Sequence, residues 1–96
     1  MSAGGTVDFS SALALVKMGH RIARIHWNGP GQFVVLNAAY PEGVPADAEL
    51  ADLAGVEAGK SVVMQPHLLI RTVDGSFAPW VPSSSDLLSN DWYMVV

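Results

Sequence analysis

The chain contains no cysteine, and charged residues make up only 15% of its 96 residues. The absence of cysteine excludes a disulfide framework, a thiolate nucleophile and a cysteine-based zinc site. Because small secreted domains usually depend on disulfides, this composition favours a cytosolic protein. No apolar run approaches the ~20 residues that span a bilayer. We therefore expect a soluble, intracellular protein with no membrane partner.

Positive charge is also scarce, with five Lys and Arg against nine Asp and Glu and a net charge of −4. Proteins that bind polymeric nucleic acid usually present a basic face, so DNA and RNA are not expected partners. A small anion remains open, because it needs only one or two cations. His26 and His67 have no partner at metal-ligand spacing, so we expect neither a metal nor a cofactor.

Hydrophobic residues make up half of the chain. A chain this short cannot bury all of them in its own core. A chain of this length forms one domain and buries only about 60–65% of its unfolded surface. We therefore expect part of the apolar surface to be covered in an oligomer. Residues 1–7 lack the basic and apolar regions of a signal peptide and are expected to form a flexible tail. Residues 8–96 are expected to form a single domain.

Residues 8–65 alternate between short helical and extended patterns. Apolar residues at helical spacing follow Asp8, a good helix cap, and the pattern stops at Gly19. Residues 47–54 predict about two helical turns that end at Gly55. Pro41, Gly43 and Pro45 indicate irregular chain. Strands are expected at residues 21–25, 32–36 and 61–64, and the first two are joined by the Asn28-Gly-Pro-Gly31 break.

The strongest local signal is a hairpin at residues 67–81. Asp74-Gly75 is the preferred dipeptide of a two-residue turn, which would place Arg71 opposite Ala78 and Leu69 opposite Trp80. Side chains then alternate between the two faces of the sheet. The expected core face carries Leu68, Ile70, Thr72, Phe77, Pro79 and Val81. The expected outer face carries His67, Leu69, Arg71, Ala78 and Trp80, and we interpret it as a binding site or a subunit contact.

The carboxy-terminal residues predict a short helical turn and a last strand. Ser83 and Asp86 have the spacing of a capping box. Residues 91–96 form an apolar strand, which favours pairing with a partner. These elements together predict an α+β fold with a small antiparallel sheet, an N-terminal helix and short helical turns.

Several short motifs occur in the order of one known family. They are Asp8-Phe-x-x-Ala-Leu, Arg24-x-x-Trp-Asn-Gly29, Pro66-His67, Thr72-x-Asp-Gly75, Pro79-Trp80 and Ser83-x-x-Asp-Leu-Leu-x-x-Asp-Trp92. Over residues 8–96 the chain resembles the second type of Thoeris anti-defence protein, a family of phage and prophage sponges. The family commonly has Ser-Gln-Thr-Asp where this chain has Ser83-Ser-Ser-Asp86, and we expect this departure to change ligand choice.

The resemblance implies a homotetramer in the cytoplasm of a bacterial host. It further implies that the protein binds cyclic ADP-ribose-like signals, and in some members cyclic dinucleotides, without cleaving them. The residue types at several positions fit such a ligand. The candidate ligand-binding residues are Trp27, Asn28, Arg71, Trp80, Ser84, Ser85 and Asp86.

Each candidate also has a structural interpretation. Trp27 can stack a purine or close the end of the core, and Asn28 can read a base edge or form a turn. Arg71 can hold a phosphate with its planar fork or form a salt bridge. Arg24 shares a face with Ile22, so a structural role is favoured for it.

The remaining candidates also have both a structural and a functional interpretation. Trp80 is more typical of a core or an interface. Ser84 and Ser85 follow Ser83 at a helix start, where free N–H groups hold either a cap or an anion. Asp86 can complete the capping box or accept from ribose hydroxyls.

Two rival functions remain open at this point. His26 and His67 could supply the acid and base of a small phosphodiesterase or ribosyl hydrolase, although no paired motif supports this. The sequence has no Gly-x-Ser-x-Gly nucleophile turn. The other rival is an oligomeric interaction module without a ligand. The residues favour binding without catalysis.

Overall fold

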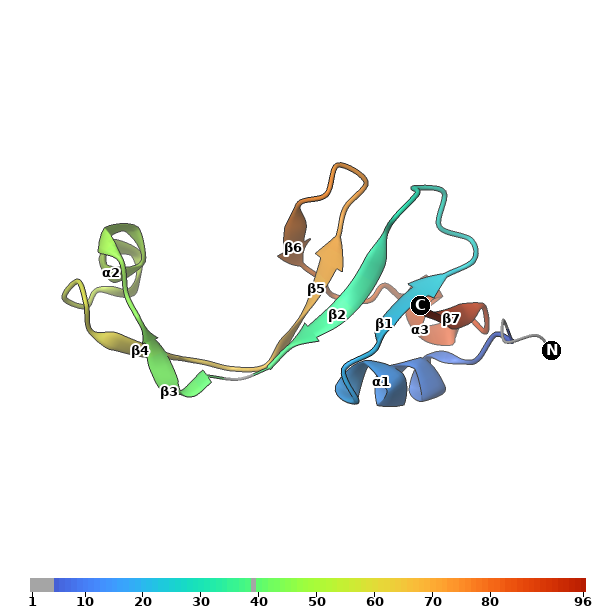
Figure 1. Cartoon of the computed structure of the whole chain (residues 1–96), viewed down its shortest axis with the longest axis horizontal. Helices are drawn as coiled ribbons and strands as arrows, with labels where there is room; N and C mark the ends of the chain where they lie inside the picture. The colour runs from blue at the N-terminus through green and yellow to red at the C-terminus, as the bar shows by residue number, and fades with distance from the viewer. Residues whose placement is uncertain (1–4, 39) are drawn as a thin grey trace. The chain divides into compact units, whose positions relative to one another are not determined.

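A computed structural model of the chain describes residues 5–38 and 40–96. Its elements combine short helices with antiparallel strands, in agreement with the α+β fold that the sequence predicts (Figure 1). The elements are α1 (Phe9–Lys17), β1 (Arg21–Arg24), β2 (Phe33–Asn37), β3 (Tyr40–Pro45), α2 (Ala48–Ala54), β4 (Ser61–Met64), β5 (His67–Arg71), β6 (Phe77–Pro79), α3 (Ser84–Leu88) and β7 (Trp92–Val95).

The described residues form two compact units, residues 5–37 with 68–96 and residues 38 with 40–67. The larger unit contains a five-stranded sheet in the order β6-β5-β2-β1-β7, and the smaller unit pairs β3 with β4. The single domain expected for residues 8–96 stays a prediction. Oligomerisation also stays a prediction.

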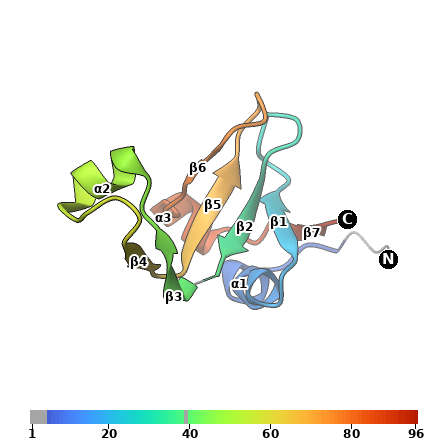
Figure 2. The same ribbon diagram turned by 60° about the vertical axis from the view of Figure 1, so that its left-hand side comes forward.

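The core of the larger unit lies between its sheet and α1 (Figure 2). Asp8 caps α1 by accepting from the Ser11 N–H at 2.8 Å, as the sequence predicts. The buried face of α1 then packs against β1, β2 and β7. The central residues of this core are Phe9, Ala12, Val16, Ile22, Val34 and Trp92.

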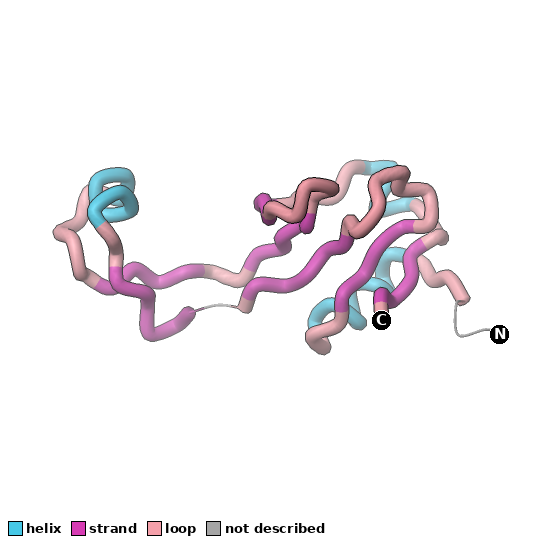
Figure 3. The backbone as a smooth tube through the Cα atoms, turned by 45° about the horizontal axis from the view of Figure 1, so that its top comes forward, coloured by secondary structure: helices cyan, strands magenta, loops and turns pink. Residues whose placement is uncertain are grey.

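Two loops lie at one end of the five-stranded sheet, which we call the loop end. Residues 25–32 join β1 to β2 in an antiparallel pair, as the sequence predicts (Figure 3). Residues 72–76 join β5 to β6. Because β7 runs antiparallel to β1 and pairs Trp92 with Arg24, the start of β7 also lies at this end.

The register of the β5–β6 hairpin differs from the predicted one by one residue. Arg71 lies opposite Phe77 and Ile70 lies opposite Ala78. Trp80 donates its backbone N–H to Leu68 O at 3.0 Å. Since a shift of one residue exchanges the faces of one strand, Trp80 joins the core face and Phe77 is 53% exposed on the outer face. The predicted pairing of Arg71 with Ala78 is therefore wrong.

The cause of this shift is a loop of three residues where the sequence predicts two. Thr72 and Ser76 close the loop through a 2.8 Å backbone hydrogen bond, and Gly75 takes a left-handed φ of +92°. The carboxylate of Asp74 accepts from the Ser76 N–H at 3.0 Å and from both neighbouring hydroxyls. A type I turn followed by a left-handed glycine is the usual three-residue hairpin loop.

The smaller unit contains a strand where the sequence predicts irregular chain. β3 pairs with β4 in a two-stranded ribbon, with a register shift between Tyr40 and Val44. Gly43 supplies a left-handed φ of +82° within that shift. A two-stranded ribbon leaves each of its strands with one unpaired edge, and such edges tolerate proline because a missing N–H there costs no ladder bond.

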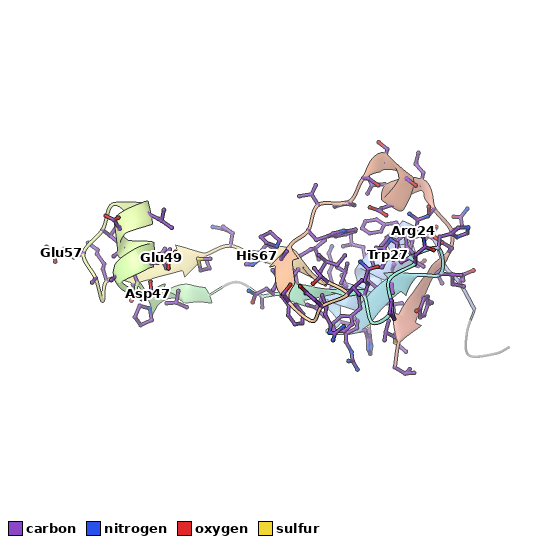
Figure 4. The ribbon with its side chains drawn as sticks, turned by 90° about the horizontal axis from the view of Figure 1, so that it is seen from above. Arg24, Trp27, Asp47, Glu49, Glu57 and His67 are labelled. Atoms are coloured by element: carbon purple, nitrogen blue, oxygen red, sulfur yellow. The ribbon has the colours of Figure 1, made fainter. Side chains whose placement is uncertain are left out.

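Acidic residues gather in this smaller unit. Asp47 caps α2 by accepting from the Leu50 N–H at 2.8 Å, and Gly55 ends the helix in the left-handed region, as the sequence predicts. Asp47, Glu49 and Glu57 extend from α2 and its flanking loops (Figure 4). All three are exposed, as is typical of solvated acids.

The described part of the expected N-terminal tail is tied to the larger unit. Val7 and Trp92 exchange two backbone hydrogen bonds, at 2.8 and 3.1 Å. Residues 1–4 lie outside the described residues. Among the described helices, none has the length and apolar character needed to cross a membrane.

Candidate functional site

Arg71 joins the two loops of the loop end. Its Nη1 donates to Gly31 O at 3.0 Å and lies 3.4 Å from Thr72 O. Gly31 has a left-handed φ of +78°, and a Cβ at this position would lie 2.6 Å from Nη1. Glycine therefore allows the guanidinium to reach the backbone of the Asn28–Gly31 loop.

The Arg71 guanidinium still has donors available for a ligand. Within the described residues, its Nε and Nη2 form no hydrogen bond. Asp74 lies nearby, and hydrogen bonds from Thr72 and Ser76 lower the pKa of Asp74 to about 2. Its negative charge opposes an incoming anion and partly offsets the attraction of Arg71.

A second polar group is centred on Arg24, which projects from β1. Its Nη1 lies 2.9 Å from Asp86 Oδ1, and its Nε lies 2.9 Å from Asp91 Oδ1. The side chains of all three residues are between 13% and 16% exposed. Arg24 therefore has the structural role that the sequence favours, because it joins β1 to α3 and to the residue that precedes β7.

Asp86 completes the capping box that the sequence predicts. Its Oδ2 accepts from the Ser83 N–H and hydroxyl, each at 2.9 Å, while the Ser83 hydroxyl accepts from the Asp86 N–H. Its other oxygen accepts from Arg24. Both oxygens are thus occupied, whereas Ser84 and Ser85 next to it are exposed.

Burial and hydrogen bonding act in opposite directions on these two carboxyls. Burial raises the pKa of Asp91, but hydrogen bonds from Arg24 and His26 outweigh it and lower the pKa to about 2. Burial also raises the pKa of Asp86, and hydrogen bonds from Ser83 and Arg24 reverse the effect and lower it. The hydrogen bond that Arg24 donates to Asp91 in turn raises the pKa of Arg24.

These lowered pKa values predict an acid-labile fold. A carboxyl whose pKa is lower in the folded than in the unfolded state stabilises the protein fully above the unfolded value of about 4. This contribution is lost as the pH falls through about 2. Urea unfolding between about pH 5 and about pH 2 should show a falling free energy of unfolding, and Asp91→Asn should flatten that slope. A slope that Asp91→Asn leaves unchanged would contradict the assignment.

Four aromatic rings fill the space beside this polar group. Trp27 meets Trp80 edge-on at 6.3 Å and Trp92 at 5.4 Å between ring centroids. Phe9 packs against Trp80 and Trp92 from α1. Trp92 is fully buried, and its Nε1 donates to Asp86 O at 2.9 Å. Trp27 and Trp80 are only partly buried, so part of each indole faces solvent.

The structure brings some of the sequence-predicted residues together and separates others. Trp27 and Trp80 are in contact, and Arg24 links Asp86 to the same end of the sheet. Arg71 lies on the outer face and contacts the loop that begins at Asn28. No contact joins Arg71 to Trp80 among the described residues, so the predicted shared face of these two residues is wrong.

Sequence reasoning missed the contact between His26 and Asp91. His26 Nδ1 lies 2.7 Å from Asp91 Oδ2, and the His26 N–H donates to the same oxygen at 3.1 Å. The two residues are 65 positions apart, so spacing gives no signal. Only the pairing of β1 with β7 would have revealed it.

His67, the second histidine considered for catalysis, contacts the backbone of a neighbouring residue. His67 begins β5, and its Nδ1 lies 2.9 Å from Gln65 O. The described residues contain no group of three or more His, Cys, Asp or Glu that could hold a metal ion. Within the same residues, a single chain shows no pocket.

Comparison with known proteins covers almost the whole chain. A family model described as the Thoeris anti-defense 2-like domain matches residues 7–95 and thus spans both compact units. The chain is also 32% identical to the protein named Thoeris anti-defense 2 of Bacillus phage SP01 over 92 residues, which is 93% of this chain and 94% of that protein. These matches confirm the resemblance that the motifs indicate, and the chain belongs to the Thoeris anti-defense 2-like family.

Proposed function

We propose that this protein counters bacterial anti-phage defence by sequestering a cyclic nucleotide immune signal without cleaving it. The expected ligand is a cyclic ADP-ribose isomer, a cyclic dinucleotide, or both. Membership of the Thoeris anti-defense 2-like family, over residues 7–95, is the observation that carries the proposal. The residues at the loop end supply chemistry that fits such a ligand.

Arg71 is the proposed phosphate contact. Gly31 O and Thr72 O fix one edge of its guanidinium, while Nε and Nη2 form no hydrogen bond with any described residue. Two parallel N–H groups match the oxygens of a phosphate, and a fixed fork loses less entropy on binding than a free one. These contacts support a side chain that would be held ready for an anion before the ligand arrives.

Trp27 and Asn28 are the proposed base contacts. Edge contacts with Trp80 and Trp92 hold the Trp27 indole in place while part of it remains in solvent. Stacking of a base on such a ring contributes about 1–3 kcal/mol. The Asn28 side chain is exposed and can both donate to and accept from a base edge. Trp80 acts mainly by supporting Trp27.

Ser84 and Ser85 are the proposed contacts to ribose or phosphate oxygens. Their side chains are exposed at the start of α3, beside the capping box. Asp86 contributes indirectly, because Ser83 and Arg24 occupy its carboxylate and thereby fix the position of the two serines. The resemblance implies a glutamine where this chain has Ser84, and we expect the loss of its amide to change ligand choice.

A homotetramer is the proposed assembly, because a single chain exposes many large apolar side chains. They include Phe77, Val81, Leu88, Met94 and Val96. β7 is also an edge strand of its sheet. Light scattering at micromolar concentration should give a tetramer, and deletion of Met94–Val96 should weaken assembly by removing strand backbone and apolar side chains that the assembly would cover. A monodisperse monomer of 10.2 kDa would contradict the proposal.

Calorimetry tests ligand binding directly. Cyclic ADP-ribose, its glycosidically linked isomers, cyclic di-AMP and cyclic di-GMP form the panel. Because a sponge acts stoichiometrically, at least one ligand should bind with a Kd near or below about 10 nM, equivalent to about −11 kcal/mol. Failure of the whole panel to bind would overturn the proposal and favour a module without a ligand.

A further inference from the structure

His26 is an exposed histidine whose ring is nevertheless held in one orientation. Its side chain is 79% exposed, yet Nδ1 lies 2.7 Å from Asp91 Oδ2. The His26 backbone N–H donates to the same oxygen at 3.1 Å. Exposed side chains normally rotate among several rotamers, but the Nδ1 contact restricts this ring, because the carboxylate that it meets is itself held by Arg24 and by the His26 backbone N–H.

The environment of Asp91 determines which ring nitrogen carries the proton. Arg24 Nε donates to Asp91 Oδ1 at 2.9 Å, and this leaves Oδ2 for the imidazole. The pKa of Asp91 is about 2, so its carboxylate is ionised at neutral pH and can only accept. Nδ1 must therefore carry the proton. In the neutral ring, Nε2 is then a hydrogen-bond acceptor.

Nε2 of His26 is available to a ligand beside the proposed base contacts. Within the described residues it forms no hydrogen bond. His26 directly precedes Trp27 and Asn28, and the turn at this point is fixed by the Trp27 N–H, which donates to Arg24 O at 3.2 Å. A fixed acceptor next to an indole and an amide is a suitable group for selecting among nucleotides.

We propose that His26 is a further ligand contact, which accepts a hydrogen bond from a ribose hydroxyl or from the exocyclic amine of a purine. Asp91 is its positioning residue, because it holds the ring and selects the tautomer. The inference rests on the proposed function and adds a specificity determinant to it. Arg24 acts one step further away by orienting Asp91.

Substitution of His26 tests the contact, and His20 offers a matched control. His20 is also an exposed histidine of the larger unit, and it precedes β1 whereas His26 follows it. For the cyclic ADP-ribose isomer that the wild type binds most tightly, His26→Ala should raise the Kd about 3- to 10-fold, as expected for one lost hydrogen bond. His20→Ala should leave the Kd unchanged.

Modified ligands identify the donor group. A set of deoxy analogues of that isomer removes its ribose hydroxyls one at a time, and a hypoxanthine analogue removes the exocyclic amine. The analogue that lacks the true donor should bind wild type and His26→Ala equally well, whereas the other analogues should keep the difference. If all analogues keep the full difference, the contact is with none of these groups and the proposal is wrong.

Nitrogen NMR of the ligand-free protein tests the geometry independently. Nitrogen shifts of the His26 ring should show Nδ1 protonated in the wild type and a mixture of tautomers in Asp91→Asn. A predominant Nε2–H tautomer in the wild type would overturn the inference. Equal affinity of wild type and His26→Ala would overturn it while leaving the proposed function intact, and a wild type that binds nothing would overturn both.

Discussion

Arg24→Met should cost about 3 kcal/mol of the free energy of unfolding, because removing one partner leaves poorly solvated charge uncompensated. Asp86 and Asp91 would both lose their cation, and their side chains are only 13% and 16% exposed. This residual exposure places the expected cost at the low end of the range for buried pairs. Domains of this size are stable by about 5–15 kcal/mol, so the loss is large. Urea unfolding at neutral pH measures it.

Arg21→Met is the matched control on the same strand. Arg21 is exposed, and its guanidinium carbon lies 5.3 Å above the Phe33 ring. An exposed cation–π contact contributes about 0.5–1 kcal/mol, so this variant should lose no more than that. The cost of Arg24→Met should also shrink as the pH approaches about 2, because a protonated Asp91 needs no cation. Equal losses in the two variants would contradict the structural role of Arg24.

Arg71→Ala should weaken binding of the cyclic nucleotide about 10- to 150-fold, the loss expected for a charge-assisted contact. The fold should lose only about 1 kcal/mol, because the hydrogen bond to Gly31 O lies at the surface. Arg71→Lys should restore binding partly, since a point charge does not reproduce the planar fork. Calorimetry and thermal unfolding of the same samples separate the two effects.

Gly31→Ala should also weaken binding of the cyclic nucleotide, although Arg71 is still present. The added Cβ would lie 2.6 Å from Nη1, and the left-handed φ of +78° disfavours alanine, so the guanidinium must move. Affinity should fall, although the charge remains. If Arg71→Ala dissociates the oligomer while each folded subunit still binds ligand, Arg71 is an interface residue and its assignment to the site is wrong.

Local chemistry explains why the helices could be predicted from the sequence. Asp8, Asp47 and Ser83 each cap a helix through a hydrogen bond to an N–H three residues later. Gly55 ends α2 in the left-handed region. Each of these contacts depends on residues that are close in sequence, so spacing alone reveals them.

The predictions for the β5–β6 register and for β3 are wrong because several interactions compete in these segments. Asp74-Gly75 favours a two-residue turn, but the Asp74 carboxylate binds Ser76 and the Thr72 hydroxyl, which stabilises a loop of three. The one additional residue in this loop shifts the register and places Trp80 on the core face, away from Arg71. In β3 the prolines indicated irregular chain, because the sequence does not show that this strand keeps an unpaired edge.

The candidate site could be predicted only in part, because some of its contacts join residues that are far apart in the sequence. Trp27, Asn28 and Arg71 were identified by side-chain chemistry, and the structure places all three at or near the loop end. The contacts of Arg24 with Asp86 and Asp91 span 62 and 67 positions. Such pairs depend on strand order and register, which a single sequence does not reveal.

The most direct test of sequestration without cleavage is a titration followed by release. A fixed amount of the tightest-binding cyclic nucleotide is mixed with increasing protein, and free ligand is measured after ultrafiltration. The free concentration should fall in proportion to the protein and reach zero at a fixed stoichiometry. Heating the mixture after long incubation should then release all of the ligand chemically intact, as judged by chromatography. A linear nucleotide or free ribosyl product, formed at substoichiometric protein, would contradict the account and identify an enzyme.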